Sequence, residues 1–200
     1  MKDFWHERYS EADFAYGTEP NAFLASLQSQ IPSGGKALAI ADGEGRNGVW
    51  LAQQGCEVTS VDYSEAGVEK ARKLAKERGV AINAICADLS EWDWPENEYD
   101  LVISIFAHFP PPLRKQVHAH ILKALKPGGT LILEAYHPTQ MEYKTGGPQS
   151  PELMYSVETL REDFASADIT SLEDLVAEVN EGKYHFGKGA VTRLVAKKPA

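Results

Sequence analysis

Gly43-Glu44-Gly45-Arg46-Asn47-Gly48 is the stretch that decides the fold, because it is a literal G-x-G-x-x-G that joins a strand to a helix. The apolar run 37–41 precedes it and predicts a short buried strand, while 49–54 predicts a helix. The run 58–61 predicts a second strand that ends in Asp62, 19 residues after the first glycine. This order and spacing are typical of a βαβ unit whose acid binds the hydroxyls of a ribose.

Outward from this unit, short apolar runs alternate with helical segments. Further strands are predicted over 80–87, 101–106 and 130–136. A helix is predicted from its N-cap Ser64 to Gly79, and another over 113–125, before Pro127. Such alternation is typical of an α/β fold with a mainly parallel sheet.

The C-terminal part is less regular. Residues 137–155 are rich in Gly, Pro and polar side chains and predict a long loop, a kind of segment that is often functional. Segment 169–180 fits both a helical period and strand alternation, whereas 190–197 predicts a strand. Between them, 181–189 reads as a connection interrupted by glycines.

Composition excludes several classes of protein. A length of 200 residues favours one domain, and a net charge of −9 disfavours a nucleic-acid or membrane-surface partner. The most apolar stretch, 101–109, is far shorter than the roughly 20 residues of a spanning helix, and the N-terminus lacks a signal-peptide pattern. Cys56 and Cys86 have neither metal nor redox spacing and are expected to be buried free thiols of a cytoplasmic protein, so no metal is expected.

The charge of the glycine loop distinguishes between cofactors. Asp42 and Glu44 would lie beside the pyrophosphate of a nicotinamide dinucleotide, where two like charges about 4 Å apart cost about 4 kcal/mol at an effective dielectric of 20. S-adenosylmethionine has no phosphate and carries a sulfonium and an ammonium, so an acidic loop suits it better. A nicotinamide-dependent oxidoreductase remains an alternative because the glycine motif is literal.

The chain resembles the class I S-adenosylmethionine-dependent methyltransferases, and among them the small tellurite-resistance and thiopurine-type enzymes. The motifs that carry the resemblance cover nearly the whole chain. They are Phe4-Trp5-His6-Glu7-Arg8-Tyr9, Ala15-Tyr16-Gly17-Thr18-Glu19-Pro20-Asn21, the glycine loop, Val61-Asp62, Ala87-Asp88-Leu89, Leu125-Lys126-Pro127-Gly128-Gly129 and Glu181-Gly182-Lys183-Tyr184-His185-Phe186-Gly187-Lys188.

The resemblance implies a three-layer, doubly wound, Rossmann-like sheet of seven strands, mostly parallel with the last strand antiparallel. It therefore favours a strand over 169–180 that pairs with 190–197. It also implies a single domain over 1–200, in which 1–30 form a helical cover or lid. A cover over a sheet edge is the alternative role for 1–30.

The resemblance further implies S-adenosylmethionine as cofactor and assigns its contacts. Asp62 would bind the ribose hydroxyls and Asp88 the adenine amino group, with the Gly43–Gly45 turn under the methionine part. The full cofactor-binding set that we expect is Tyr16, Asp42, Gly43, Glu44, Gly45, Arg46, Asp62, Tyr63, Asp88, Leu89 and Ile105.

The glycine loop departs from the family at two positions. The family usually has an acid where this chain has Ala39 and a glycine where it has Ala41. We hypothesise that Asp42 or Glu44 replaces part of the missing acid's role at the amino-acid end of the cofactor. The departure leaves open a non-catalytic binding or regulatory module with the same fold.

Ligands of open α/β sheets bind beyond the carboxyl ends of the strands, which here selects 106–109 and 136–138, with Tyr184-His185 within reach. His108 and His185 are the candidates for proton transfer, since histidine titrates near neutral pH; a hydrogen-bonded structural histidine is the alternative. The expected function is in-line methyl transfer to a small soft nucleophile: a thiol, a chalcogen oxyanion or a related metabolite. The acceptor's identity and the oligomeric state remain open.

Overall fold

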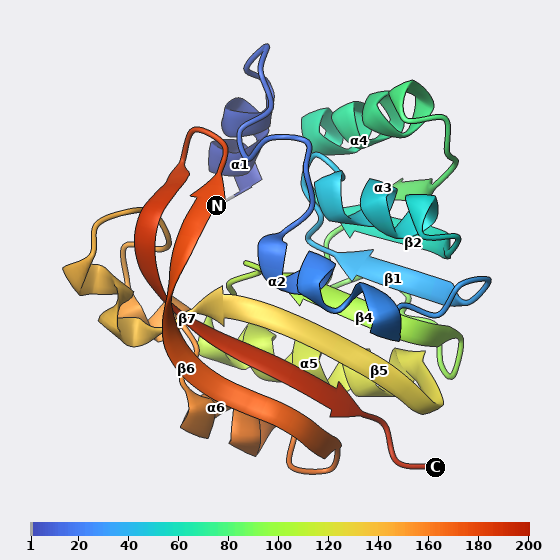
Figure 1. Ribbon diagram of the computed structural model, residues 1–200, viewed down its shortest axis with the longest axis vertical. Helices are drawn as coiled ribbons and strands as arrows, with labels where there is room; N and C mark the ends of the chain where they lie inside the picture. The colour runs from blue at the N-terminus through green and yellow to red at the C-terminus, as the bar shows by residue number, and fades with distance from the viewer. Residues whose placement is uncertain (1) are drawn as a thin grey trace.

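Seven strands form one sheet in the order β3-β2-β1-β4-β5-β7-β6 (Figure 1). The computed structural model describes residues 2–200, with side chains from Trp5 onward, so the Met1 end of the expected cover and the Phe4 side chain lie outside the described residues. The strands are β1 Lys36–Ile40, β2 Glu57–Asp62, β3 Asn83–Cys86, β4 Tyr99–Ile105, β5 Leu125–Tyr136, β6 Asp168–Glu181 and β7 His185–Lys197.

The pairing confirms the predicted topology. β1 pairs in parallel with both β2 and β4, and the last strand, β7, is antiparallel to β5 and to β6. The segment 169–180, whose sequence fits two periods, is therefore a strand. Because the chain order reverses on either side of β1, a crevice forms beyond the carboxyl ends of β1 and β4.

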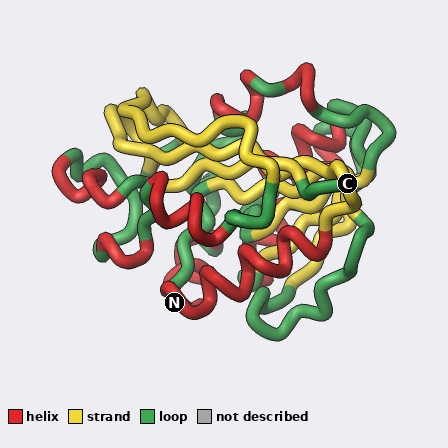
Figure 2. The backbone as a smooth tube through the Cα atoms, turned by 90° about the horizontal axis from the view of Figure 1, so that it is seen from below, coloured by secondary structure: helices red, strands yellow, loops and turns green. Residues whose placement is uncertain are grey.

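Helices cover both faces of the sheet, as Figure 2 shows from below. They are α1 Lys2–Tyr9, α2 Ala22–Ser26, α3 Arg46–Gln53, α4 Glu65–Glu77, α5 Pro111–Ala124 and α6 Val157–Asp163, with short 3-10 turns at Gln28–Gln30, Pro138–Glu142 and Pro151–Leu153. Ser64 caps α4 by accepting the N–H of Gly67, as predicted. The α3 helix begins three residues earlier than expected, directly after the left-handed Gly45.

Alternation along β1 explains the three layers. Leu38 and Ile40 join the core cluster that α5 and α6 cover, whereas Ala37 and Ala39 join the cluster with Leu51 of α3 on the opposite face. All four β1 side chains are nearly inaccessible to solvent. A strand buried on both faces reads as a continuous apolar run, which is why its sequence was recognisable.

Three strands begin three or more residues away from the predicted start. β5 begins at Leu125 rather than 130, because Leu125 already pairs with Tyr99 ahead of a local irregularity. β3 is confined to Asn83–Cys86, so 80–82 connect it to α4. β7 begins at His185, because its pairing with β6 continues to the Glu181–His185 pair. Most residues of the expected 181–189 connection therefore belong to the paired strands of the β6–β7 hairpin.

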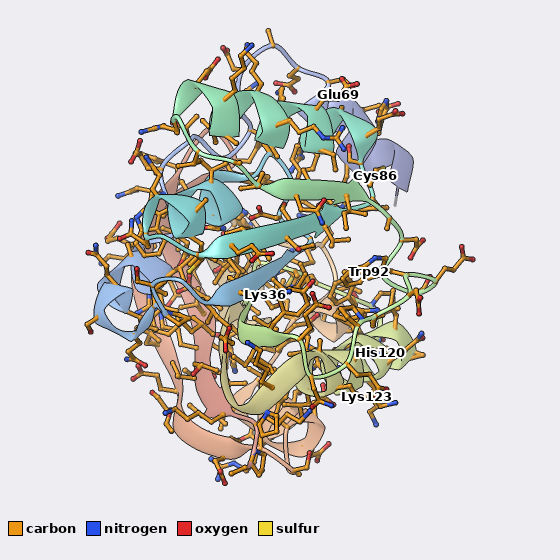
Figure 3. The ribbon with its side chains drawn as sticks, turned by 90° about the vertical axis from the view of Figure 1, so that its right-hand side faces the viewer. Lys36, Glu69, Cys86, Trp92, His120 and Lys123 are labelled. Atoms are coloured by element: carbon orange, nitrogen blue, oxygen red, sulfur yellow. The ribbon has the colours of Figure 1, made fainter. Side chains whose placement is uncertain are left out.

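The expectation that both cysteines are buried is wrong for Cys86. Cys56 is buried, but Cys86 is exposed at the end of β3, the outermost strand on its side of the sheet (Figure 3). An edge strand has a neighbour on one side alone, so less of its surface is covered.

β6 forms the other edge of the sheet. It carries no Lys or Arg, and its exposed acids are Asp168, Glu173, Asp174 and Glu178. The β6–β7 hairpin extends beyond the rest of the sheet to lie beside α1 (Figure 1). Among residues 2–200, no helix is long and apolar enough to cross a membrane, and no group of side chains could hold a metal ion.

Candidate functional site

A cavity of about 740 Å³ lies at the carboxyl ends of β1, β2, β4 and β5, where the topology places a crevice. The N-terminal segment, the loop after β5 and the β6–β7 hairpin close over it. Its lining residues are Trp5, Arg8, Tyr9, Tyr16, Gly17, Ala41, Asp42, Glu44, Arg46, Asn47, Asp62, Tyr63, Asp88, Leu89, Ile105, Phe106, Ala107, His108, Phe109, Pro110, Leu113, Tyr136, Gly146, Gly147, Pro148, Gln149, Leu153, Tyr184 and His185.

The expected cofactor residues gather in this cavity: nine of the eleven line it, and the remaining two, Gly43 and Gly45, form the turn beneath. The set therefore forms one continuous surface across β1, β2 and β4. His108 and His185, the two candidates for proton transfer, also line this cavity. Whether each residue contacts a cofactor remains a prediction.

Asp62, at the end of β2, is held by the backbone. The N–H groups of Gly43 and Ser64 each donate to one of its carboxylate oxygens, both at 2.9 Å. Burial raises the pKa of Asp62 to about 6 despite these hydrogen bonds. A carboxylate fixed by two backbone donors keeps lone pairs for the hydroxyls of a ligand.

The glycines of the loop allow close approach of other residues. A Cβ on Gly43 would lie 2.6 Å from Tyr9 Oη, so Tyr9 of α1 packs directly on the turn. A Cβ on Gly48 would lie 2.4 Å from a carboxylate oxygen of Asp42. The loop thus has room for the N-terminal helix above and for a buried acid below.

Asp42 and Glu44, the two candidates for the missing acid's role, have different surroundings. Ser60 Oγ donates to Asp42 at 2.9 Å and the Gly48 N–H at 3.2 Å, and burial raises the pKa of Asp42 to about 7. Glu44 instead accepts the Ala15 N–H at 2.8 Å and pairs with Lys70 at 2.7 Å. Glu44 therefore ties the N-terminal segment to α4, and Asp42 is the better candidate of the two.

Arg46 points to the β6–β7 hairpin. Its guanidinium pairs with Glu181 at 2.6 Å, and Asn21 donates its side-chain amide to Glu181 at 2.8 Å and also to Glu134. Burial alone would raise the pKa of Glu181, but the His185 hydrogen bond and the Arg46 charge hold it at about 2. These side chains are buried and join the N-terminal segment to α3, β5 and β6. Sequence reasoning missed this network, because alternation along β6 gives no sign that one of its acids is buried.

Two residues of the cavity wall have a strained backbone. Ala41 has φ +47° and Phe106 has φ +52°, a region that non-glycine residues rarely adopt. They follow the neighbouring strands β1 and β4. The glycine that the family has at position 41 would occupy this conformation without strain, so the departure at Ala41 has a structural cost.

The two histidine candidates differ in their free nitrogens. His108 Nδ1 lies 2.9 Å from the Leu153 carbonyl oxygen, and its Nε2 accepts the Tyr136 N–H at 3.4 Å. Burial lowers the pKa of His108 to about 4, so its ring is neutral, with Nδ1 as the donor. This is the geometry of the structural alternative. Both nitrogens of His108 are thus already engaged.

His185 stands among aromatic rings, with centroid distances of 4.4 Å to Tyr16, 4.9 Å to Phe106 and 5.3 Å to Tyr136. Its Nδ1 is buried, and its nearest acid oxygen, on Glu181, is 3.5 Å away, at the limit of a hydrogen bond. Burial lowers the pKa of His185. Within residues 2–200 no hydrogen bond engages its Nε2, so that nitrogen can accept a proton.

The loop after β5 supplies the remaining wall, as expected of a long loop. Gln140 is buried and donates to the carbonyl oxygen of Gly146 at 3.1 Å, which fixes the loop. A Cβ on Gly147 would lie 2.8 Å from the Tyr136 ring. This end of the cavity is aromatic and free of carboxylates, in contrast to the acidic end near Asp62.

The charges of the lining side chains fit S-adenosylmethionine better than a dinucleotide. Asp42, Asp62 and Asp88 line the acidic end of the cavity, and the guanidinium of Arg46 is already paired with Glu181. A pyrophosphate would meet acids here, whereas hydroxyls, amines and a sulfonium would meet acceptors. The residues present therefore fit the expected cofactor.

Comparison with known proteins finds similarity to methyltransferases. A family model described as a methyltransferase domain matches residues 37–129. Sterol 24-C-methyltransferase of Saccharomyces cerevisiae is 26% identical over 153 residues, which are 75% of this chain and 40% of that protein. The chain thus spans about two fifths of the length of such a curated relative.

Solved structures share the fold. One, described as "Conversion of a Disulfide Bond into a Thioacetal Group during Echinomycin Biosynthesis", has a TM-score of 0.81 at 20% identity, covering 100% of this chain and 93% of the other. TehB from Haemophilus influenzae has a TM-score of 0.74 at 17% identity, covering 98% of this chain and 66% of TehB.

Proposed function

We propose that this chain, which belongs to the class I S-adenosylmethionine-dependent methyltransferase family, transfers a methyl group to a small soft nucleophile: a thiol, a chalcogen oxyanion or a related metabolite. The observation that carries the proposal is the division of one cavity into an acidic end and an aromatic end that contains His185. The cofactor of the family is S-adenosylmethionine, which supplies an electrophilic methyl group when bound.

The acidic end would hold the cofactor. Asp62 would accept hydrogen bonds from the two ribose hydroxyls and Asp88 from the adenine amino group, while the turn at Gly43 would lie under the methionine part. Charged acceptors that are fixed by backbone N–H groups bind without reorganising, which favours a defined ligand position.

The aromatic end would hold the acceptor. The cavity volume of about 740 Å³ is in the range that encloses one drug-sized ligand, so cofactor and acceptor together require a small acceptor. Rings exclude water there, and exclusion of water favours an unsolvated sulfur or oxygen nucleophile.

His185 Nε2 would accept the proton of a thiol as the sulfur forms its bond to the methyl carbon. S-adenosylmethionine, when bound, would supply the methyl group and would keep the electron pair of the broken carbon–sulfur bond as a neutral thioether. An oxyanion acceptor does not need to lose a proton in order to attack the methyl carbon. His185→Gln should therefore slow methylation of a thiol at least tenfold and leave methylation of tellurite or selenite within about threefold. Equal slowing of both acceptor classes would contradict a proton-accepting role.

Calorimetric titration with S-adenosylmethionine, S-adenosylhomocysteine and NADH tests the cofactor assignment. Asp62→Ala should weaken binding of both sulfur compounds by about 1.5–3 kcal/mol, about tenfold or more. Asp93→Ala, which removes an exposed acid outside the cavity lining, is the matched control and should change neither. Binding of NADH alone would overturn the proposal.

An acceptor panel tests the substrate class. It should contain small thiols, tellurite and selenite, and also a sterol and a quinol, because sterol and ubiquinone methyltransferases are among the relatives. Turnover of the first group supports the proposal, and turnover of the second alone contradicts it. Cofactor binding without turnover of any acceptor would favour the non-catalytic module.

A further inference from the structure

We propose that Tyr155 is a positioning residue that fixes the acceptor-side wall of the cavity, formed by residues 106–110. All five of these residues line the cavity, whereas Tyr155 does not. The proposal rests on the proposed function only in assigning this wall to the methyl acceptor. The hydrogen bonds between Tyr155 and the wall do not depend on the proposed function.

The Tyr155 hydroxyl bridges the wall at two points. It donates to the Ala107 carbonyl oxygen at 2.9 Å and accepts the Phe109 N–H at 2.8 Å. The Tyr155 side chain is completely buried. The hydroxyl therefore replaces the solvent that two loop backbone groups would otherwise need.

The wall is a strained segment held from several sides. The Phe106 N–H donates to the Glu134 carbonyl oxygen at 2.7 Å, which secures one end of the wall at the residue with positive φ. His108 is tied to the carbonyl oxygen of Leu153, two residues before Tyr155. A strained conformation persists where its surroundings determine it, and Tyr155 provides two of the bonds that do so.

Tyr155 is itself fixed to the sheet. The Tyr155 N–H donates to the Tyr136 carbonyl oxygen at 2.9 Å, and Thr192 Oγ1 of β7 donates to the Tyr155 carbonyl oxygen. The segment 153–155 thus joins β5, β7 and the wall. Movement of this segment would move the wall with it.

A buried charged cluster supports the Tyr155 ring from the side away from the cavity. The His118 ring meets it edge-on at 5.4 Å, and Asp163 holds His118 at 2.8 Å and Arg114 at 2.7 Å. These three side chains lie on α5 and α6 and none lines the cavity. Their role in this arrangement is to hold the ring at one angle, so that the hydroxyl reaches both wall atoms.

The acidic end is independent of this arrangement. Asp62 ends β2 and Asp88 lies shortly after β3. Asp62 accepts the N–H groups of Gly43 and Ser64, and Asp88 accepts the N–H of Ser90. Loss of the Tyr155 hydroxyl should therefore affect the acceptor and spare the cofactor. A general loss of structure would affect both.

The test compares Tyr155→Phe with Tyr99→Phe. Tyr99 is also a buried tyrosine, but it begins β4 at the end of the strand away from the cavity. Removal of one hydroxyl is a small change, and saturating S-adenosylhomocysteine in the hydrogen-exchange samples stabilises the folded state by mass action; the Kd and KM are measured without it. Amide hydrogen exchange is followed over 107–109, together with the Kd for S-adenosylmethionine and the acceptor KM.

Tyr155→Phe should speed exchange at Phe109 and raise the acceptor KM at least tenfold each, with the cofactor Kd within twofold of wild type. Tyr99→Phe should change none of the three. Unchanged exchange at Phe109, or a cofactor Kd that weakens in step with the acceptor KM, would overturn the proposal. If wild type methylates no acceptor, the proposed function fails, while exchange and cofactor Kd still decide whether Tyr155 fixes the wall.

Discussion

Asp42→Asn should make the protein more stable at neutral pH and bind its cofactor less tightly. Asp42 lines the cavity between Ser60 and the Gly48 N–H, and asparagine keeps an oxygen that can accept either bond. The substitution therefore removes the charge of the side chain and retains its shape and its partners.

The stability change follows from the raised pKa. Burial raises the pKa of Asp42 from 3.8 to about 7, so between these values the folded protein binds a proton that the unfolded chain has lost. Stability therefore falls as pH rises through this interval, and the whole penalty is present above pH 7. A shift of about three units corresponds to at most about 4 kcal/mol at 1.4 kcal/mol per unit.

Urea unfolding at pH 4 and pH 8, followed by tryptophan fluorescence, measures this penalty. Asp42→Asn should gain about 2–4 kcal/mol at pH 8 and almost nothing at pH 4. Asp93→Asn, which changes an exposed acid, is the control and should gain little at either pH. An equal gain at both pH values would refute the reasoning, because that gain would not come from ionisation.

The same Asp42→Asn variant tests cofactor binding. If Asp42 takes part of the role of the acid missing at Ala39, a cationic ligand lowers its pKa, and binding near pH 7 releases a proton. Calorimetry in two buffers of different ionisation enthalpy detects that proton. Asp42→Asn should abolish the release and weaken S-adenosylmethionine binding. An unchanged affinity rejects this role for Asp42.

Three further substitutions test the loop, the cover and the buried network, each by its free energy of unfolding. Ala41→Gly should be about neutral, because relief of the left-handed conformation offsets the entropy of glycine, whereas Ala39→Gly within β1 should cost about 1 kcal/mol or more. Gly182→Ala places a Cβ 2.5 Å from the Tyr16 backbone and should cost about 1–3 kcal/mol more than Gly79→Ala, which has a similar φ and open space; equal costs would argue against tight docking of the hairpin. Arg46→Leu leaves Glu181 buried without its ion-pair partner and should cost about 3–5 kcal/mol; a cost below about 1 kcal/mol would mean that water reaches the pair.

The parts of the fold that were predictable are those set by local chemistry. The Ser64 cap, the glycine after α4 and the apolar run of β1 each depend on residues close in sequence. Segment 169–180 was not decided by its own pattern, since an edge strand exposed on much of its surface has weak alternation. Its resemblance to known methyltransferases, rather than its periodicity, indicated a strand.

The site was predictable only where chemistry and strand position coincide. Asp62 and Asp88 follow strands, so the sheet brings them together. The sequence could not distinguish His108 from His185, because the difference lies in contacts with residues far along the chain: Leu153 for His108, and Tyr16 and Phe106 for His185. The same holds for Tyr155, whose partners are more than 40 residues away.

The acids along the open edge of β6 affect how copies of the chain meet at high concentration. A second β6 strand approaching antiparallel would bring carboxylates against carboxylates, with no Lys or Arg on either strand to compensate. Long bare edges otherwise invite fibre-like pairing, so the charge acts as a barrier to it. Since salt shortens the reach of such repulsion to about 8–10 Å at physiological strength and less above it, solubility of this protein should fall as ionic strength rises.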